Sequence, residues 1–590
     1  MFTAILASAL LGFAPLKIEI TVKDTNDGDT LSIEKTFRVT AQSDHPVTKV
    51  EFYVGDSLRD SDSSTPYEFV VDPLNESDGA LKISFVAYSS EGERAKKDLT
   101  LKIDTGVGKG ADFHVNHGQE LLIERKWSEA IQAGRIALKA KPGHNPARIL
   151  MARAYMGQGA MDKAQQFAED ALAADPTYAE GRELLAAINL KKALNSVSRG
   201  GENPNSSARA DALKLVSEAM KTAVTLRRAN LDAMANALPE PNDENRLKVA
   251  DGNIRAMRFD AAVKALYSPF MRDPKNSAFG NRVAYAQIRQ SKLTDAAITL
   301  REMEKAGGLD AYGSALQSVL LAIAGQDAEA DKVMADAIGN DPENLGVRSG
   351  QVYIALKRGR TGAFGNLINS LAKDEGQRTE VNYYLSILQQ ALRSFTEADE
   401  RFGSAVLAEP ANSDMYVERG NQAVLMVLTN RITDTDGKNY QYAVADAYYQ
   451  SALTAWPDSP QALAAFAVLK SVQGRPVDAV TYADAAMKAG SGYAAAHYVG
   501  SLVLSSAAVD MTNRASKLRV DAKGSPDAET RQKIADYEVQ ARDYTERANK
   551  AKASAERLDP RQLSGRSIPK ALDVFEYFYR HGRIVQLSLP

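Results

Sequence analysis

The stretch Met151–Tyr178, MARAYMGQGAMDKAQQFAEDALAADPTY, places small side chains where a helix normally buries large ones. Counted from Asn145, small residues stand at places 8, 15, 20 and 27, and a proline stands at place 32. Small residues allow two helices to cross closely, and proline ends a helix because its nitrogen carries no hydrogen to donate. The stretch therefore predicts a hairpin of two tightly packed helices that ends at Pro176.

The same spacing recurs along most of the chain with a period of 34 residues, and it is degenerate only in unit 345–378. A fixed period of this length is typical of proteins in which each repeat stacks on its neighbours. The predicted units begin at Ala111, Asn145, Ala179, Asp243, Ser277, Ala311, Leu345, Thr379, Ser413, Pro460 and Ala494.

This pattern resembles the tetratricopeptide repeat. The resemblance implies a mostly α fold, in which residues 113–560 form a right-handed superhelical solenoid of about eleven helical hairpins. It also implies that the first helix of each unit lines a concave face, and that this face binds a peptide or a protein segment. The clamp of Lys and Asn that some chaperone-binding members use for a terminal carboxylate is not present in this sequence.

Three predicted units carry insertions. The first two are a loop at 196–208, SVSRGGENPNSSA, and a segment at 429–439, TNRITDTDGKN, between two helices. The last unit, 494–558, has two lengthened helices, and the second carries an apolar seam that needs a partner helix. The partner is either the preceding helix of the same hairpin or a helix of another protein. The seam consists of Ile534, Tyr537, Ala541, Tyr544, Ala548, Ala551, Ala555 and Leu558.

The segment 561–590 follows the last predicted unit. A helix is expected over 569–581, and its aromatic residues favour one of two roles. Either it caps the open end of the stack, or it docks another protein.

Residues 15–104 are predicted to form a β-sandwich of six or seven short strands, because apolar and polar residues alternate there with a period of two. Turn-forming residues separate the alternating runs. The segments VTKVEFYVGDSLRDSDSSTPYEFVVD and GALKISFVAYSSEGE resemble the bacterial immunoglobulin-like domains of surface and secreted proteins. The resemblance implies a spacer or an adhesive module outside the cytoplasm.

Residues 105–112 form a glycine-rich linker between the predicted sandwich and the repeats. A phosphate-binding loop requires a first glycine and a Ser or Thr after the lysine, and Lys109 is followed by Gly110 instead. No nucleotide cofactor is therefore expected at the linker.

The start of the chain, MFTAILASALLGFAP, has the length and apolar character of a signal peptide over residues 1–14. Gly12 and Ala14 are small residues at the spacing that cleavage after Ala14 requires. We therefore expect export to the periplasm or the cell surface. The alternatives are a buried first strand or a misplaced start codon. No later stretch is apolar enough to cross a membrane.

The composition excludes several classes of function. The chain of 590 residues has no cysteine, which excludes disulfides, thiolate nucleophiles and Cys-ligated metals. Its net charge of −3 gives no reason to expect a nucleic-acid partner. His114 and His117 lie three apart without a recognisable third ligand, so no metal site is expected. No catalytic motif is present, so neither a cofactor nor an enzymatic activity is expected.

The places that line the concave face in the tetratricopeptide family hold Tyr and Arg in several units. These residue types dominate binding hot spots, although Tyr at the ninth place also packs between helices. The candidate protein-binding residues are Arg282, Tyr285, Arg289, Tyr353, Lys357, Tyr383 and Tyr384.

The sequence thus predicts an exported, non-catalytic scaffold that binds a peptide or protein segment on its concave face. Two alternatives stay open. One is a structural or adhesive surface protein that self-associates through the immunoglobulin-like domain. The other is a scaffold in a cell-envelope complex, such as a periplasmic system of polysaccharide export or outer-membrane assembly.

Overall fold

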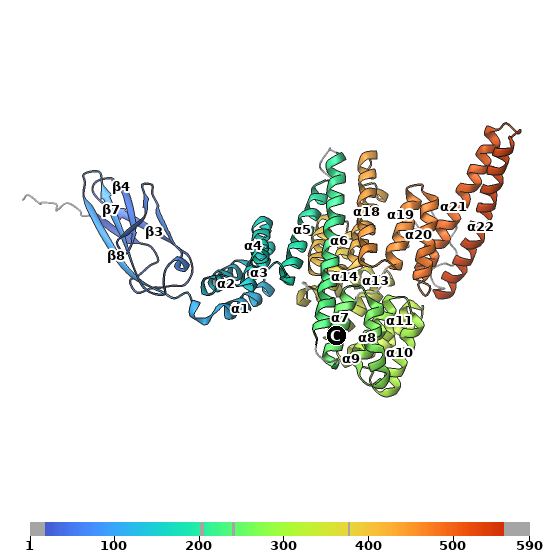
Figure 1. The fold of residues 1–590 in the computed structure, drawn as a ribbon, viewed down its shortest axis with the longest axis horizontal. Coiled ribbons are helices and arrows are strands. Elements are labelled where there is room, and N and C mark those ends of the chain that lie inside the picture. The colour runs from blue at the N-terminus through green and yellow to red at the C-terminus, as the bar shows by residue number, and fades with distance from the viewer. Residues whose placement is uncertain (1–17, 201–205, 239–241, 376–377, 560–590) are drawn as a thin grey trace, which may run out of the picture. The chain divides into compact units, whose positions relative to one another are not determined.

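A computed structural model describes residues 18–200, 206–238, 242–375 and 378–559. The predicted signal peptide and the predicted helix at 569–581 lie outside these residues. The chain divides into two compact units, Met1–Leu184 and Leu185–Pro590. Figure 1 shows strands in the first unit only, and helices in both. The mostly α fold with an N-terminal β-sandwich is as the sequence predicts.

The sandwich has eight strands in two sheets, one or two strands more than predicted. A three-stranded sheet has the order β1-β3-β6, and a five-stranded sheet has the order β2-β8-β7-β4-β5. All pairings are antiparallel except that of β2 with β8. The strands are β1 (Glu19–Val22), β2 (Thr30–Leu31), β3 (Lys35–Gln42), β4 (Val47–Val54), β5 (Ser57–Asp62), β6 (Tyr67–Val71), β7 (Gly79–Ser89) and β8 (Arg94–Ile103).

Four phenylalanines form the centre of the sandwich. Phe37 and Phe69 come from the three-stranded sheet, Phe52 and Phe85 come from the five-stranded sheet, and each is at most 2% exposed. The Phe52 and Phe85 ring centroids lie 5.2 Å apart. Alternating residues of a strand face one side of the sheet, so the period-two pattern of the sequence supplies this core.

The glycine-rich linker is structured, and the sandwich contacts the first hairpin. The 3-10 helix η2 (Val107–Lys109) occupies the linker, and α1 begins at Ala111, within the range predicted for the linker. The His114 ring Nε2 lies 2.7 Å from the Gly106 carbonyl oxygen. Arg135 on α2 forms an ion pair with Asp72, which caps the 3-10 helix η1 (Pro73–Asn75) of the sandwich.

The described residues contain 22 α-helices, of which twenty pack as ten hairpins of successive helices, while α5 and α6 contribute to one apolar core. The first helix of each successive pair begins at the first residue of a predicted unit. These helices are α1 (Ala111–Ile123), α3 (Asn145–Gly157), α5 (Ala179–Gly200), α7 (Asp243–Arg255), α9 (Ser277–Arg289), α11 (Ala311–Ile323), α13 (Leu345–Lys357), α15 (Thr379–Ala391), α17 (Ser413–Leu428), α19 (Pro460–Val472) and α21 (Ala494–Asp521).

The second helices of the pairs carry the even numbers. They are α2 (Trp127–Ala140), α4 (Met161–Ala174), α6 (Ser206–Ala237), α8 (Phe259–Arg272), α10 (Leu293–Ala306), α12 (Asp327–Asn340), α14 (Thr361–Glu375), α16 (Phe395–Ala408), α18 (Thr435–Ala455), α20 (Pro476–Ala489) and α22 (Ala528–Leu558).

The small residues of the repeat lie where helices cross. Ala152, Ala164 and Ala171 of the opening stretch are all 0% exposed. A Cβ atom added to Gly118 of α1 would lie 2.3 Å from Cδ2 of Leu150 on α3. Only a residue without a side chain permits this approach, which is why the eighth place of the repeat is small.

Two of the predicted insertions are helical for part of their length. α5 continues to Gly200 and α6 begins at Ser206, so the predicted loop at 196–208 is shorter than expected. α18 begins at Thr435, within the predicted segment 429–439. The insertions thus extend helices, because several of their residues are good helix formers or caps; Asp434, for example, accepts a hydrogen bond from the Gly437 amide.

The long last hairpin pairs with itself. α21 and α22 contact each other along their length, and Ile534, Ala541, Ala548 and Ala555 of the apolar seam are buried. The seam therefore packs against the preceding helix, which is the first of the two alternatives for its partner. No described helix is both long and apolar enough to be a membrane span.

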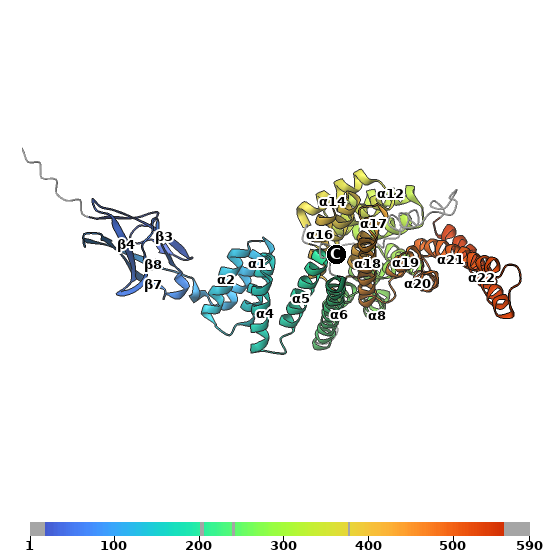
Figure 2. The ribbon, with the colours of Figure 1, turned by 90° about the horizontal axis from the view of Figure 1, so that it is seen from above.

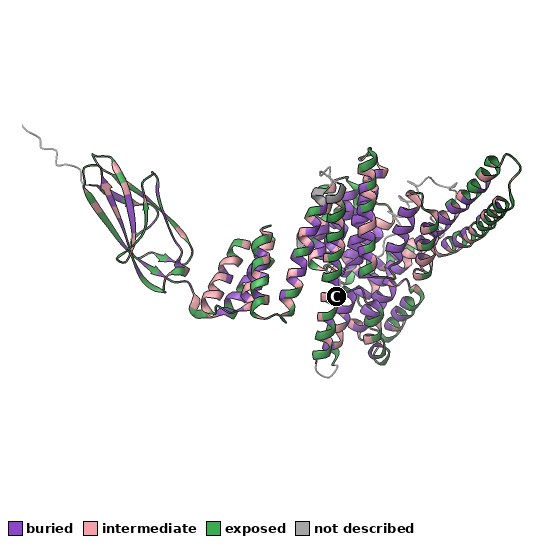
Figure 3. Ribbon diagram, turned by 45° about the horizontal axis from the view of Figure 1, so that its top comes forward, coloured by how far each residue is buried: buried purple, intermediate pink, exposed green. Residues whose placement is uncertain are grey.

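The hairpins of the second unit curl until helices far apart in sequence meet. α6 packs against α18, as the two views of Figures 1 and 2 show. The hydroxyl group of Tyr440 on α18 donates a hydrogen bond to the carbonyl of Val197 on α5, at 3.0 Å. The apolar core runs through the interior of this unit from α5 to α22 (Figure 3).

Candidate functional site

The seven predicted binding residues lie on the first helices α9, α13 and α15, facing the interior of the second unit. Lys357 has a side chain that is 10% exposed, and the other six are buried. Their exposed fractions are 7% for Arg282, 2% for Tyr285, 1% for Arg289, 4% for Tyr353 and 0% for both Tyr383 and Tyr384.

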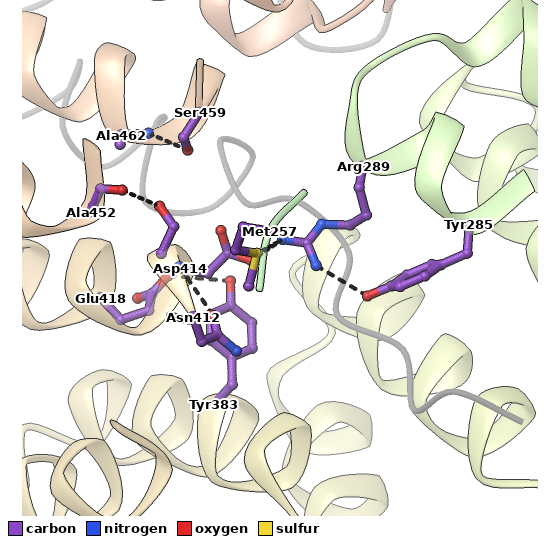
Figure 4. Close-up of polar contacts among 11 residues, drawn as sticks. Met257, Tyr285, Arg289, Tyr383, Asn412, Asp414, Glu418, Ala452, Ser459 and Ala462 are labelled. Carbon is purple, nitrogen blue, oxygen red and sulfur yellow. Dashed lines mark hydrogen bonds and ion pairs between the residues drawn. The ribbon is translucent and has the colours of Figure 1, made fainter. Parts of the chain in front are cut away.

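Arg289 forms an ion pair with Asp414 across the interior of the unit. The Arg289 Nη2 atom donates to Oδ2 of Asp414 at 2.6 Å, although the two residues are 125 positions apart. Nη1 donates to the hydroxyl group of Tyr285 at 3.1 Å, and Nη2 also contacts the sulfur of Met257 (Figure 4). Burial acts to lower the pKa of Arg289, but the charge of Asp414, together with the hydroxyl groups of Tyr285 and Tyr383, outweighs burial and the pKa is raised.

Two aromatic rings cover the Arg289 guanidinium. Its central carbon lies 4.8 Å from the ring centroid of Phe259 and 5.7 Å from that of Trp456. Phe259 begins α8, whereas Trp456 follows α18, and their rings meet edge to face at 5.0 Å. Through its ion pair and its cation–π contacts, Arg289 therefore connects α8 and α9 with α17 and the end of α18, which are far apart in sequence.

The remaining predicted residues also contact the chain itself. Arg282 forms a bidentate ion pair with Asp251 of the preceding hairpin, at 2.5 and 3.0 Å. Tyr383 donates to Glu418 at 3.4 Å, and its ring meets that of Tyr384 at 5.2 Å. Lys357 Nζ lies 3.9 Å from the Asp559 carboxylate.

The structure thus brings Tyr285 and Arg289 together, and it brings Tyr383 close to Tyr384. Partner binding by these seven side chains stays a prediction. Six of these side chains are buried, and several are already paired within the chain. Removal of one partner of a buried ion pair costs about 3–5 kcal/mol. Binding of a segment by these side chains therefore requires the curl to open.

A pair of carboxyl groups lies in the same interior. The pKa of Glu409 is raised to about 7, mainly by burial and then by the negative charge of Glu380, against the opposing charges of Arg255, Arg227 and Arg289. Burial likewise raises the pKa of Glu380. Arg255 Nε lies 3.8 Å from the Glu409 carboxylate.

Sequence reasoning missed the acidic residues that form ion pairs with the predicted binding residues Arg282 and Arg289. Asp414 stands at the second place of its unit, which is one of the concave places. The 34-residue spacing could therefore have identified it. Asp251 stands at the ninth place of its unit, which is also a concave place, whereas Glu409 and Trp456 stand outside those places and no local pattern marks them. Their role arises from which hairpins meet when the unit curls.

Two clefts open on the surface of the second unit. One, of about 740 Å³, lies between α6, α18, α19 and α20 and includes Lys214, Asp446 and Tyr482. The other, of about 880 Å³, lies where the turns after α7 and α9 face the turn after α18. Among the described parts of the chain, no group of three or more His, Cys, Asp or Glu is placed to hold a metal ion.

Two family models match the chain. Residues 121–188 match the model described as tetratricopeptide repeat, and residues 19–84 match the model described as bacterial Ig domain. The chain contains tetratricopeptide repeats and a bacterial Ig domain. The matched repeat residues span the end of α1 to α5, and the Ig match spans β1 to β7.

No curated protein matches the chain. Among solved structures, yeast Tom70 is 14% identical, covers 75% of this chain and 96% of its own, and has a TM-score of 0.29. Human IFIT1 in complex with m7Gppp-AAAA is 15% identical and covers 70% of this chain and 90% of its own, with a TM-score of 0.38. The fibronectin(III)-like modules of Clostridium thermocellum CbhA are 28% identical over 15% of this chain and 97% of theirs, with a TM-score of 0.14.

Proposed function

We propose that this tetratricopeptide protein is an exported, non-catalytic scaffold that holds a segment of another protein on its second unit. The repeat fold supports a protein-interaction role, and the bacterial Ig domain supports a location outside the cytoplasm. One observation carries the proposal. The second unit is closed by buried contacts such as Arg289–Asp414, and it still presents two charged clefts on its surface.

Rigid frames favour binding because less conformational entropy is lost when a partner docks. The interior of the curl is filled by contacts of the chain with itself, whereas the surface clefts are open. The proposal therefore places the bound segment at a cleft of the curl, where buried Arg289 supports Phe259 and Trp456 in the wall of the cleft of about 880 Å³.

Self-association through the Ig domain is the alternative that the geometry favours less. β5 is an edge strand, and it carries Arg59 and Asp60, which are exposed, and Asp62, which is half-buried. Charged residues on an edge strand oppose pairing with a second copy.

The proposal is tested with the full-length chain, tagged at its C-terminus and expressed in a bacterial host. Fractionation and the mass of the product are expected to show export and loss of residues 1–14. Crosslinking in place, followed by peptide mapping, is expected to connect a partner to residues 185–559. A cytosolic product of full mass would overturn export.

Light scattering of the purified full-length chain separates the scaffold from the adhesive alternative. A monomer is expected. A concentration-dependent oligomer, with crosslinks confined to residues 18–104 of two copies, would replace the scaffold proposal by self-association.

A further inference from the structure

The cleft of about 880 Å³ is built from three turns that are far apart in sequence. The turn between α7 and α8 contributes Arg258, the turn between α9 and α10 contributes Gln290, and Trp456 lies at the end of α18. Arg228 of α6 completes the wall. The curl of the second unit brings these residues together, so the cleft exists only in the closed unit.

Several buried polar atoms in the wall have no hydrogen-bond partner. They are Nε of Arg228, Nε of Arg258, and both the nitrogen and the oxygen of the Gln290 amide. An unsatisfied buried polar group costs free energy, and native proteins leave few of them. Four such atoms lie around one cleft, so a ligand that enters it meets side chains with unused donors and an unused acceptor.

The cleft also carries more positive than negative charge. Its lining includes Arg228, Arg258, Lys292 and Lys488, against Asp260 and Asp458. Asp260 already pairs with Lys292 at 3.0 Å, and Asp232 pairs with Arg258 at 2.8 Å.

Among the described residues Arg228 forms no ion pair with a carboxylate, although the negative charge of Asp232 acts to raise its pKa. In the described parts of the chain its guanidinium donates only to the backbone carbonyls of Ala256 and Ala455. Burial lowers the pKa of Arg228, and the nearby positive charge of Arg258 lowers it further. Both effects mean that an anion in the cleft would stabilise the cation.

We propose that this cleft binds a carboxylate-bearing segment of a partner protein, with Arg228 and Arg258 contacting the carboxylate and Gln290 pairing with a peptide group. An amide side chain offers one donor and one acceptor, which matches the N–H and C=O groups of an extended peptide. Guanidinium groups match the geometry of carboxylates. This inference rests on the proposed scaffold function and names the chemistry of the segment.

The test measures fluorescence polarisation of a fluorescein-labelled peptide of four glutamates and two glycines, added to the full-length chain. A matched peptide has glutamine in place of glutamate. The glutamate peptide is expected to bind at least about tenfold more tightly, because charge-assisted hydrogen bonds are the stronger kind. Arg228→Gln and Arg258→Gln are each expected to weaken its binding about tenfold.

Gln290→Leu separates binding from folding. Removal of an unsatisfied buried amide is expected to leave the melting temperature unchanged or raise it, while binding of the glutamate peptide weakens severalfold. Arg301→Gln, on an exposed part of α10, removes the same charge as the arginine variants and is expected to leave binding unchanged.

Equal weakening by Arg301→Gln would overturn the inference in favour of non-specific charge attraction. Full displacement of the peptide by equimolar inorganic phosphate would reduce the cleft to a general anion site. The scaffold function is tested separately. A partner that crosslinks equally well to wild type and to Gln290→Leu would support the scaffold function and contradict peptide binding at this cleft.

Discussion

Two aspartates at the same place of the repeat have opposite surroundings in the two units. Asp112 is the second residue of α1 in the first unit, and its side chain is 88% exposed. Asp414 is the second residue of α17 in the second unit, and its side chain is 0% exposed. The thirteenth place shows the same contrast, with Ile123 77% exposed and Arg289 1% exposed.

The difference shows that the repeat determines how neighbouring helices pack, but not what faces the concave side. In the first unit, the hairpins α1–α2 and α3–α4 bury small residues where their helices cross. These two hairpins are neighbours in sequence and pack against each other. In the second unit the array curls on itself, and α9 buries nearly all of its residues from Phe279 to Arg289. Polar groups on that face must then find partners within the chain.

The largest expected effect is the loss of the buried cation. Arg289→Ala leaves Asp414 buried without its counter-ion, and we expect the free energy of unfolding of the second unit to fall by about 3–5 kcal/mol. Urea titration followed by the fluorescence of Trp456, in a Trp127→Phe background, measures this value.

The matched control for this comparison is Asp112→Ala, which removes an exposed partner of His144 and is expected to cost about 0.5 kcal/mol or less. The double variant Arg289→Met with Asp414→Leu is expected to recover most of the loss, because no charge then stays buried. Similar small costs for both single variants would mean that the two units do not differ in this way.

The next effect concerns the packing that the units share. A Cβ on Gly118 would lie 2.3 Å from Cδ2 of Leu150, and one on Gly280 would lie 2.4 Å from the sulfur of Met303. Gly118→Ala and Gly280→Ala are each expected to cost about 1–3 kcal/mol, with the smaller cost at Gly280 because Met adapts its shape readily.

Gly339 of α12 provides the control, since a Cβ there meets no atom within 4 Å. Gly339→Ala is expected to stabilise the second unit by about 0.5–1 kcal/mol, which is the helix preference of Ala over Gly. Thermal unfolding by circular dichroism measures all three variants. A neutral Gly118→Ala would show that close crossing is not what the repeat spacing provides in the first unit.

The last expected effect is a dependence on pH that arises in the second unit. Glu409 has a pKa of about 7 in the folded chain and an ordinary value of 4.5, so between these values only the folded state keeps the proton. The free energy of unfolding should therefore fall as pH rises from about 4.5 to 7, by up to about 3 kcal/mol, and then level off.

Glu409→Gln keeps a neutral side chain at every pH and is expected to remove this slope. Unfolding midpoints in urea at pH 5, 6, 7 and 8 test the difference between the variant and wild type. Stability that rises with pH over this range would mean that the ion pair with Arg255, and not burial, has the larger effect on the pKa of Glu409.

The period of 34 residues was sufficient to predict the hairpins, their starting residues and the small side chains at their crossings. These features depend on contacts between helices that are neighbours in sequence, so they can be predicted from the local spacing of residues. The period-two pattern predicted the sandwich for the same reason, although β2, with two residues, is too short to be recognised from alternation.

The tertiary structure alone decided what lies on the inner side of the curl. Arg289 and Asp414 are 125 residues apart, and Trp456 meets Phe259 across nearly 200 positions. Small rotations between successive hairpins add up over the array, and no single unit records their sum. Burial of Arg289, the raised pKa of Glu409 and the cleft beside Arg228 all follow from that closure.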